Sequence, residues 1–275
     1  MTKRLVSLLL SVALLALALP ACAVKAPEVR WSFAVSLSTL KSTYVRLVDK
    51  EHLLEENYVP ENLVKVTLRK VGSSTIQLDS IAYDALCALF DGAAAEGCSL
   101  LVKSGYRSYG TQKTMYRNRL EKDGGKDTGV VAAPGASDHQ TGWGCDILNT
   151  EYAGKPRMTS DFGATMEGQW LQTHCADYGF VIRYPEGKEE LTGTIYEPWH
   201  LRYVGREAAS YIMGRGLCLE EFTQEAEDAI AMYQMEGGDI DALLAYEAEH
   251  ESFGPEPFYT DTFGEDGDVE VSMKF

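Results

Sequence analysis

The stretch SDHQTGWGCD, residues 137–146, indicates both the fold and the chemistry of this chain. It places His139 seven residues before Asp146, with two glycines between them. Glycine lets a chain turn tightly, so an imidazole and a carboxylate can converge on one point. Cys145 stands beside the carboxylate. Because zinc binds thiolates as well as carboxylates, Cys145 is an alternative ligand at this point.

The alternation of side chains in a strand favours the carboxylate over the thiol. If this segment is a β-strand, residues 144 and 146 face one side and residue 145 faces the other. The thiol of Cys145 would then pack in the opposite face. We therefore prefer Asp146 as the ligand.

A second segment, YEPWH at residues 196–200, supplies Glu197 and a further histidine, His200. Two histidines and one carboxylate form the open, three-ligand set of a catalytic zinc site. Zinc lowers the pKa of bound water to roughly 7, and a nearby carboxylate can take the proton. Glu197 therefore suits the role of general base.

The other histidines show no such pattern. His52 and His250 lie in charged surroundings without a second ligand nearby in sequence, so we expect both to be exposed. His174 lies beside Cys175 in a segment with helical periodicity, where helix packing is the expected role.

Arg107 lies in SGYRSYGTQ, residues 104–112, directly after a predicted buried strand. A guanidinium held rigidly there can grip a carboxylate or a developing oxyanion. The alternative is an ordinary surface arginine in a turn. The residues alone leave both interpretations open.

The order of predicted elements favours an α+β fold, because helices and short strands alternate without a regular βαβ rhythm. No internal repeat is present. The predicted helices span residues 79–96, 108–125, 165–178 and 202–214, with one or two more within 222–246; strands are expected within 98–108 and at 180–183, and a polar turn at 186–191.

Three blocks together resemble the VanY-like zinc D-alanyl-D-alanine carboxypeptidases. They are SGYRSYGTQ, SDHQTGWGCD and RYPEGKEELTGTIYEPWHLRYVG, and LVDKEHLLEENYVPENLVKV upstream is also similar. The resemblance covers about residues 45–222. It implies a hedgehog-like α+β fold, in which a small antiparallel sheet flanked by helices carries the metal.

The same resemblance implies the roles of individual residues. It makes Glu197 the catalytic base and Arg107 a group that contacts the substrate or stabilises the transition state. It implies zinc bound by His139, Asp146 and His200, with Gln112 and Ser137 lining the substrate site. One departure is Gly144, where the family usually has alanine.

The amino terminus has the form of a secretory signal, with Lys3 and Arg4 before an apolar stretch at residues 5–19. Cleavage after Ala23 competes with a lipobox in which Cys22 carries lipid. We therefore expect an extracytoplasmic protein at the bacterial cell envelope, either secreted or anchored as a lipoprotein. Five cysteines remain without Cys22, so at least one thiol is unpaired.

Four segments follow from these patterns. We expect a signal peptide at residues 1–23, a linker at 24–44, the zinc carboxypeptidase domain at 45–222 and an acidic extension at 223–275. The end of the extension, 253–275, has the composition of a disordered tail. It is expected to be a solvated appendage, or else a segment that binds a partner or spaces the protein from the wall.

The net charge of −16 comes entirely from the carboxyl-terminal end. Residues 220–275 hold 17 acidic residues and one basic residue, and the rest of the chain holds 24 of each. No basic stripe is present for a phosphate backbone, which excludes nucleic acid as the expected partner. We expect a monomer that meets a membrane only through its signal or a lipid anchor.

The leading hypothesis is an exported zinc metallocarboxypeptidase that removes the terminal D-alanine from peptidoglycan stem peptides. An L,D-carboxypeptidase acting on tetrapeptide stems would use the same catalytic residues. A further alternative is a non-catalytic, zinc-containing cell-wall binding protein. The presence of Glu197 argues against it, because a structural zinc site fills its fourth position with protein and needs no base.

Overall fold

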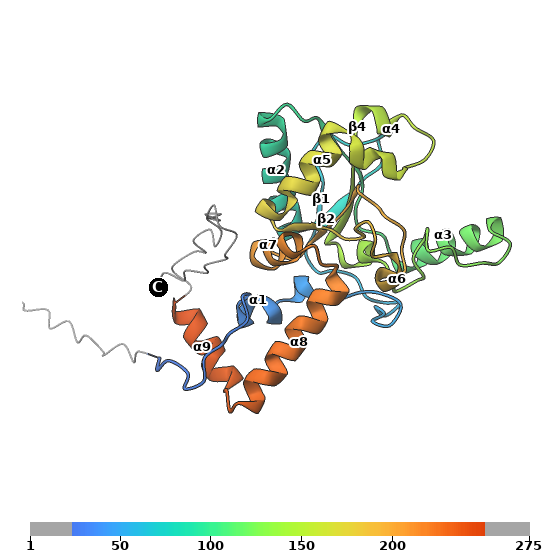
Figure 1. The fold of residues 1–275 in the computed structure, drawn as a ribbon. Coiled ribbons are helices and arrows are strands. Elements are labelled where there is room, and N and C mark those ends of the chain that lie inside the picture. Colours follow the sequence, from blue (N-terminus) through green and yellow to red (C-terminus); the bar gives the residue numbers. More distant parts are fainter. Residues whose placement is uncertain (1–23, 251–275) are drawn as a thin grey trace, which may run out of the picture.

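A computed structural model describes residues 24–250 of this chain (Figure 1). The predicted signal segment, Cys22 and the tail 253–275 lie outside the described residues. Within residues 24–250, none of the helices combines the length and the apolar character that crossing a membrane requires.

A four-stranded antiparallel sheet lies at the centre of the molecule, with strand order β3-β4-β6-β5. A two-stranded antiparallel sheet, β1-β2, lies beside it. The strands are β1 (Leu63–Lys65), β2 (Gln77–Asp79), β3 (Leu100–Ser104), β4 (Gly144–Asn149), β5 (Phe180–Ile182) and β6 (His200–Tyr203). Small antiparallel sheets with separate helices confirm the predicted α+β class.

The α-helices surround these sheets. They are α1 (Leu37–Lys41), α2 (Ser80–Ala95), α3 (Tyr109–Lys122), α4 (Thr150–Ala153), α5 (Met166–His174), α6 (Glu189–Thr192), α7 (Arg206–Arg215), α8 (Leu219–Met235) and α9 (Ile240–His250). Short 3-10 helices are η1 (Thr43–Val45), η2 (Asp138–Thr141), η3 (Ser160–Ala164) and η4 (Cys175–Tyr178). Figure 1 shows α3 projecting away from the rest of the molecule.

The main core lies between α2, α5 and the four-stranded sheet. α2 begins at the cap residue Asp79, whose carboxylate accepts from the backbone N–H of Ile81. Such a cap satisfies a donor that the first helical turn leaves free. The apolar face of α2 then packs Leu86 and Leu89 against Ile147 of β4 and its neighbours. This packing makes β4 a rigid support for the residues at its end.

The two ends of the described chain pack on each other. Leu37 of α1 is buried with Tyr233 of α8 and Leu243 of α9, and Trp31 packs edge-on against Tyr233. Figure 1 shows α8 and α9 as a hairpin that receives the amino-terminal segment. Residues 24–44, a linker by composition, therefore hold a helix and buried apolar side chains.

Three local expectations differ from the structure. The predicted helix 202–214 begins at Arg206, and β6 occupies the residues before it. β6 reads as part of a helix because it is a short, fully covered strand that pairs on both sides and shows little alternation. The polar turn at 186–191 contains the short helix α6. The predicted helix 165–178 is divided into α5 and the 3-10 helix η4. All five cysteines in the described residues are unpaired, which agrees with the expectation of at least one unpaired thiol.

Candidate metal centre and active site

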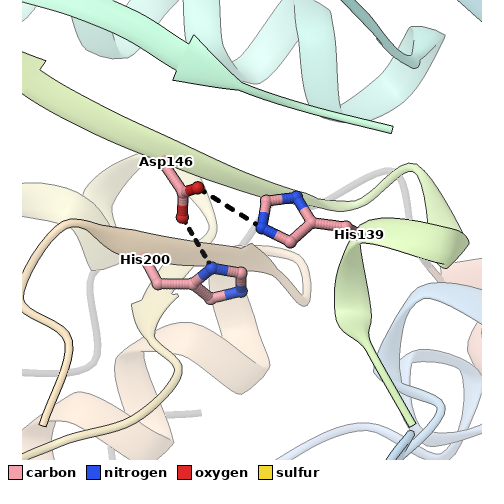
Figure 2. A group of neighbouring side chains, drawn as sticks. All are labelled: His139, Asp146 and His200. Atoms are coloured by element: carbon pink, nitrogen blue, oxygen red, sulfur yellow. Dashed lines mark hydrogen bonds and ion pairs between the residues drawn. The ribbon is translucent and has the colours of Figure 1, made fainter. Parts of the chain in front are cut away.

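Three elements bring His139, Asp146 and His200 together. His139 lies on η2, and Gly142 ends that turn in the left-handed conformation, with φ of 76°, so that the chain can enter β4. Asp146 on β4 is the direct cross-strand partner of His200 on β6. The three candidate ligand atoms lie within 4.8 Å of one another, and all three residues are buried (Figure 2).

The orientation of His139 is set by its backbone neighbours. Its Nδ1 lies 2.7 Å from the carbonyl oxygen of Gly105, where it can only donate. The backbone N–H of Arg107 in turn donates to the carbonyl of His139 at 3.0 Å. The Nε2 atom therefore keeps its lone pair and lies 3.4 Å from Asp146 Oδ2. Such a second-nitrogen contact is typical of metal-binding histidines.

Asp146 lies between the two imidazoles. Its Oδ1 is 2.9 Å from His200 Nδ1, and the hydroxyl of Ser104 donates to its Oδ2. Burial opposes ionisation, but the charges and hydrogen bonds of His139 and His200 outweigh it and hold the pKa of Asp146 well below its usual range. The carboxylate is therefore ionised at neutral pH.

This donor set fits a zinc ion. Two imidazoles and a carboxylate on three separate elements leave the fourth position of a tetrahedral ion free for water or substrate. The structure places Cys145 in the main core on the other face of β4. Burial raises the pKa of this thiol well above its usual range, so it does not supply a thiolate to the site.

Glu197 lies in the turn that leads into β6. Its backbone N–H donates to the carbonyl of Tyr184, and its own carbonyl accepts from the N–H of His200, both at 3.0 Å. The side chain is partly buried. Burial raises the pKa of Glu197 to about 7, against the opposing charges of His200 and Arg107. A carboxylate with such a pKa can both accept and return a proton near neutral pH.

Arg107 and Gln112 form one polar chain. Arg107 Nη1 donates to Gln112 Oε1 at 2.8 Å, and Gln112 Nε2 donates to the carbonyl of Ala132 at 2.7 Å. Gln112 is buried, and Arg107 is partly buried. The arginine is therefore not a free surface side chain, and its charge acts on both His139 and Glu197.

Ser137 precedes η2 and is buried. Its carbonyl accepts from the N–H of Gln140 at 3.0 Å, which helps to shape the turn that carries His139. The structure thus places Ser137 next to a candidate ligand in the chain. Among residues 24–250, no side-chain hydrogen bond joins Ser137 to His139, Asp146 or His200.

The other histidines lie elsewhere. His52 is exposed and pairs with Asp49 at 2.9 Å. His250 is exposed and stacks on Tyr246. His174 stacks on Trp170 at 4.9 Å between ring centroids. None of them belongs to the one metal-ligand cluster found among residues 24–250.

Three contributors to the site were missed by the sequence analysis. Ser104 and the carbonyl of Gly105 hold Asp146 and His139, and Asp138 lies buried beside His139. Ser104 is the register partner of Asp146 across a bulge, which sequence spacing does not reveal. Asp138 carried no comparable signal, because its neighbours Ser137, His139 and Gln140 are polar as well.

Comparison with known proteins agrees with this geometry. The family model of D-alanyl-D-alanine carboxypeptidase, VanY, matches residues 75–206. YodJ of Bacillus subtilis (strain 168), a carboxypeptidase by name, is 42% identical over 185 residues, which cover 66% of this chain and 67% of that protein.

Solved structures of similar proteins extend the match. A structure of the LD-carboxypeptidase LdcB is 41% identical, covers 65% of this chain and 84% of that one, and has a TM-score of 0.61. Two structures of VanY of the VanB type are each 32% identical to this chain, and each match covers 98% of the VanY chain. One, in complex with D-alanine-D-alanine, covers 66% of this chain with a TM-score of 0.56. The other, with Zn(II), covers 65% with a TM-score of 0.54. This chain therefore belongs to the VanY-like zinc D-alanyl-D-alanine carboxypeptidase family.

Proposed function

We propose that this enzyme is a zinc carboxypeptidase that removes the terminal D-alanine from peptidoglycan stem peptides. The observation that carries the proposal is the buried carboxylate of Asp146 between two imidazoles, with Glu197 beside them. His139, Asp146 and His200 would hold the zinc ion. Membership of the VanY-like family supports the substrate class.

A zinc ion in this centre would polarise the scissile carbonyl and make water acidic enough to attack near neutral pH. Glu197 would take the proton of the attacking water and deliver it to the nitrogen of the leaving D-alanine. Burial raises the pKa of this carboxyl group in the metal-free protein, which favours return of the proton, since a base must also become an acid within one cycle. Its partly buried position limits competition from bulk water.

Arg107 would bind the carboxylate at the end of the substrate. Its bond to Gln112, which is itself anchored on the carbonyl of Ala132, holds the guanidinium in one orientation. A guanidinium can make two parallel bonds to a carboxylate. This recognition would require a free chain end, as a carboxypeptidase does.

A second candidate is an L,D-carboxypeptidase that acts on tetrapeptide stems. The specific observation in its favour is the similarity to LdcB, at 41% identity and a TM-score of 0.61. The roles of Glu197 and Arg107 would be unchanged, since both groups act on the amide and the chain end. The family match and the VanY structures favour D,D-cleavage.

The test is mass spectrometry of products formed from stem pentapeptide and stem tetrapeptide in parallel, with purified residues 24–275 and zinc. We expect the pentapeptide to lose one alanine and a chelator to stop the reaction. Loss from the tetrapeptide alone would replace this proposal with the L,D-activity. An intact pentapeptide and an intact tetrapeptide after prolonged incubation would contradict both.

We also propose that the enzyme acts outside the cytoplasm. The charged start and apolar stretch of residues 1–19 support export, and Cys22 is the candidate lipid acceptor. Expression of the full chain in a bacterial host, followed by fractionation and intact-mass measurement, tests this. We expect a processed chain outside the cytoplasm, and retention of an unprocessed chain in the cytoplasm would contradict it.

A further inference from the structure

One buried carboxylate beside the candidate metal centre has no role in the proposed function. Asp138 is 0% exposed and lies directly before His139 in the chain. Arg202 Nη1 donates to its Oδ1, and Arg183 Nε lies 2.8 Å from its Oδ2. Both guanidiniums are buried as well. Two permanent cations therefore compensate the cost of burying this charge.

The same carboxylate faces His200. Asp138 Oδ2 lies 4.0 Å from His200 Nε2, which has no hydrogen-bond partner within residues 24–250. The ion pair with Arg183 holds Oδ2 in this position. The other ring nitrogen of His200, Nδ1, points to Asp146 (Figure 2). A neutral imidazole carries one proton on one of its two nitrogens. If Nδ1 is the ligand, the proton lies on Nε2 and faces Asp138.

We propose that Asp138 is a positioning residue for His200. The negative charge of Asp138, 4.0 Å from Nε2, favours the tautomer that carries its proton on Nε2 and so presents the lone pair of Nδ1 to the metal. Carboxylates that hold a metal-binding histidine in this way fix its tautomer and increase its basicity. This inference rests on the proposed zinc site, and it concerns the atom of His200 that binds.

Segments outside the family match contact the two arginines that pair with Asp138. Arg183 makes a two-pronged contact to Glu220 of α8, at 2.7 and 2.9 Å. Arg202 Nη2 donates to the carbonyls of Tyr44 and Arg46, at 3.0 and 2.7 Å. Residues 44–46 and α8 both lie outside the matched range 75–206. The flanking segments thus support Asp138 through its two arginines.

A measurement on the unaltered protein tests the tautomer. Nitrogen-15 NMR of labelled histidine, with and without zinc, reports which nitrogen of His200 carries a proton. We expect Nε2 to stay protonated with zinc bound and the Nδ1 resonance to shift on metal binding. Coordination through Nε2 would overturn the inference.

A charge-removing variant tests the contribution to binding. D138N keeps the size of the side chain, and we expect it to weaken zinc binding by about 10- to 100-fold, the range found for lost outer contacts of metal ligands. Competition with a chromophoric chelator measures this. Zinc affinity within twofold of wild type in folded D138N would overturn the inference.

E207Q is the matched control. Glu207 is a partly buried carboxylate that accepts bonds from Ser36 and Thr39, each at 2.6 Å, at the start of α1. We expect E207Q to lower stability without changing zinc affinity. An equal loss of affinity in both variants would show a general effect of destabilisation and overturn the positioning role.

These outcomes separate this inference from the proposed function. Wild-type protein that binds no zinc would contradict the proposed function itself. Wild-type protein that binds zinc through His200 Nε2, or with an affinity that D138N leaves unchanged, would contradict only the role of Asp138. If D138N does not fold, the NMR measurement on the wild type decides.

Discussion

Asp138 and Asp146 are both buried next to His200, but their surroundings differ. Asp138 contacts two arginines, which keep their charge at any pH the protein meets. Asp146 contacts two histidines and a serine, which can be neutral. The first carboxylate is compensated by the protein alone. The second is compensated by two imidazoles whose charge depends on pH and whose nitrogens can bind a metal, which is why the site around Asp146 suits a metal.

The largest effect on zinc binding is expected when the carboxylate of Asp146 is removed. D146N should weaken zinc binding by more than 100-fold and abolish carboxypeptidase activity, because the anionic ligand is lost. C145A is the matched control, since Cys145 is adjacent in the chain but faces the core. It should keep zinc and cost about 1 kcal/mol of stability. Equal loss of zinc in both variants, measured by equilibrium dialysis, would contradict the assignment.

The next effect separates holding the metal from doing the chemistry. E197Q should lower kcat by about 10²- to 10⁴-fold, the usual contribution of a general base. Zinc affinity should change by less than a few-fold, since Glu197 is not among the three grouped ligands. Steady-state kinetics with stem pentapeptide, alongside metal analysis, measures both. A variant that turns over at the wild-type rate would refute the assigned base.

Arg107 is a permanent cation whose charge acts on His139 and Glu197 of the candidate active site. R107K keeps the charge but loses the planar fork that grips a carboxylate. We expect kcat/KM to fall by about 10- to 100-fold and zinc affinity to stay unchanged, an effect within the range of a lost charge-assisted pair. Kinetics with a substrate amidated at its carboxyl end provides the control. R107K should cost little there, and an equal loss on both substrates would exclude a role in carboxylate recognition.

The last effect concerns pH. The folded-state pKa of Glu197, about 7, lies above its ordinary value of 4.5. In zinc-stripped protein the folded state therefore favours the protonated acid. The contribution of this group to the free energy of unfolding is fully present below about pH 4.5 and is lost as the pH rises to about 7. E197Q does not ionise, so at pH 8 its free energy of unfolding should exceed that of wild type by about 3 kcal/mol.

Urea unfolding with chelator present, at pH 4.5, 6 and 8, measures this difference. The two proteins should differ little at pH 4.5 and should diverge between pH 4.5 and 7. A constant difference across the three pH values would contradict the raised pKa. The wild type with zinc serves as a second control, because a bound cation favours the ionised carboxylate.

Local patterns predicted much of this molecule. The cap at Asp79 and the spacing of apolar residues after it predicted α2 to within a residue at each end. The alternation of side chains along a strand predicted Cys145 and Asp146 on opposite faces, as the structure has them. These features depend on neighbours along the chain, so sequence contains the information.

Features set by distant partners were missed. The last two residues of β6 were predicted as the start of a helix, because the identity of this strand comes from pairing with β4 and β5. The contacts of α1 with α9 join segments about 200 residues apart, so composition alone suggested a linker and an extension. Asp138 escaped notice because its arginines come from β6 and the residue after β5. The register of the strands decides which side chains contact each other across the sheet, and this register cannot be derived from local sequence patterns.

The most direct test of the central claim is a crystal of the zinc-loaded protein measured at the zinc absorption edge. The account predicts one anomalous peak bounded by His139 Nε2, a carboxylate oxygen of Asp146 and His200 Nδ1. A zinc ion held elsewhere, or no peak in protein that cleaves the pentapeptide, would contradict it.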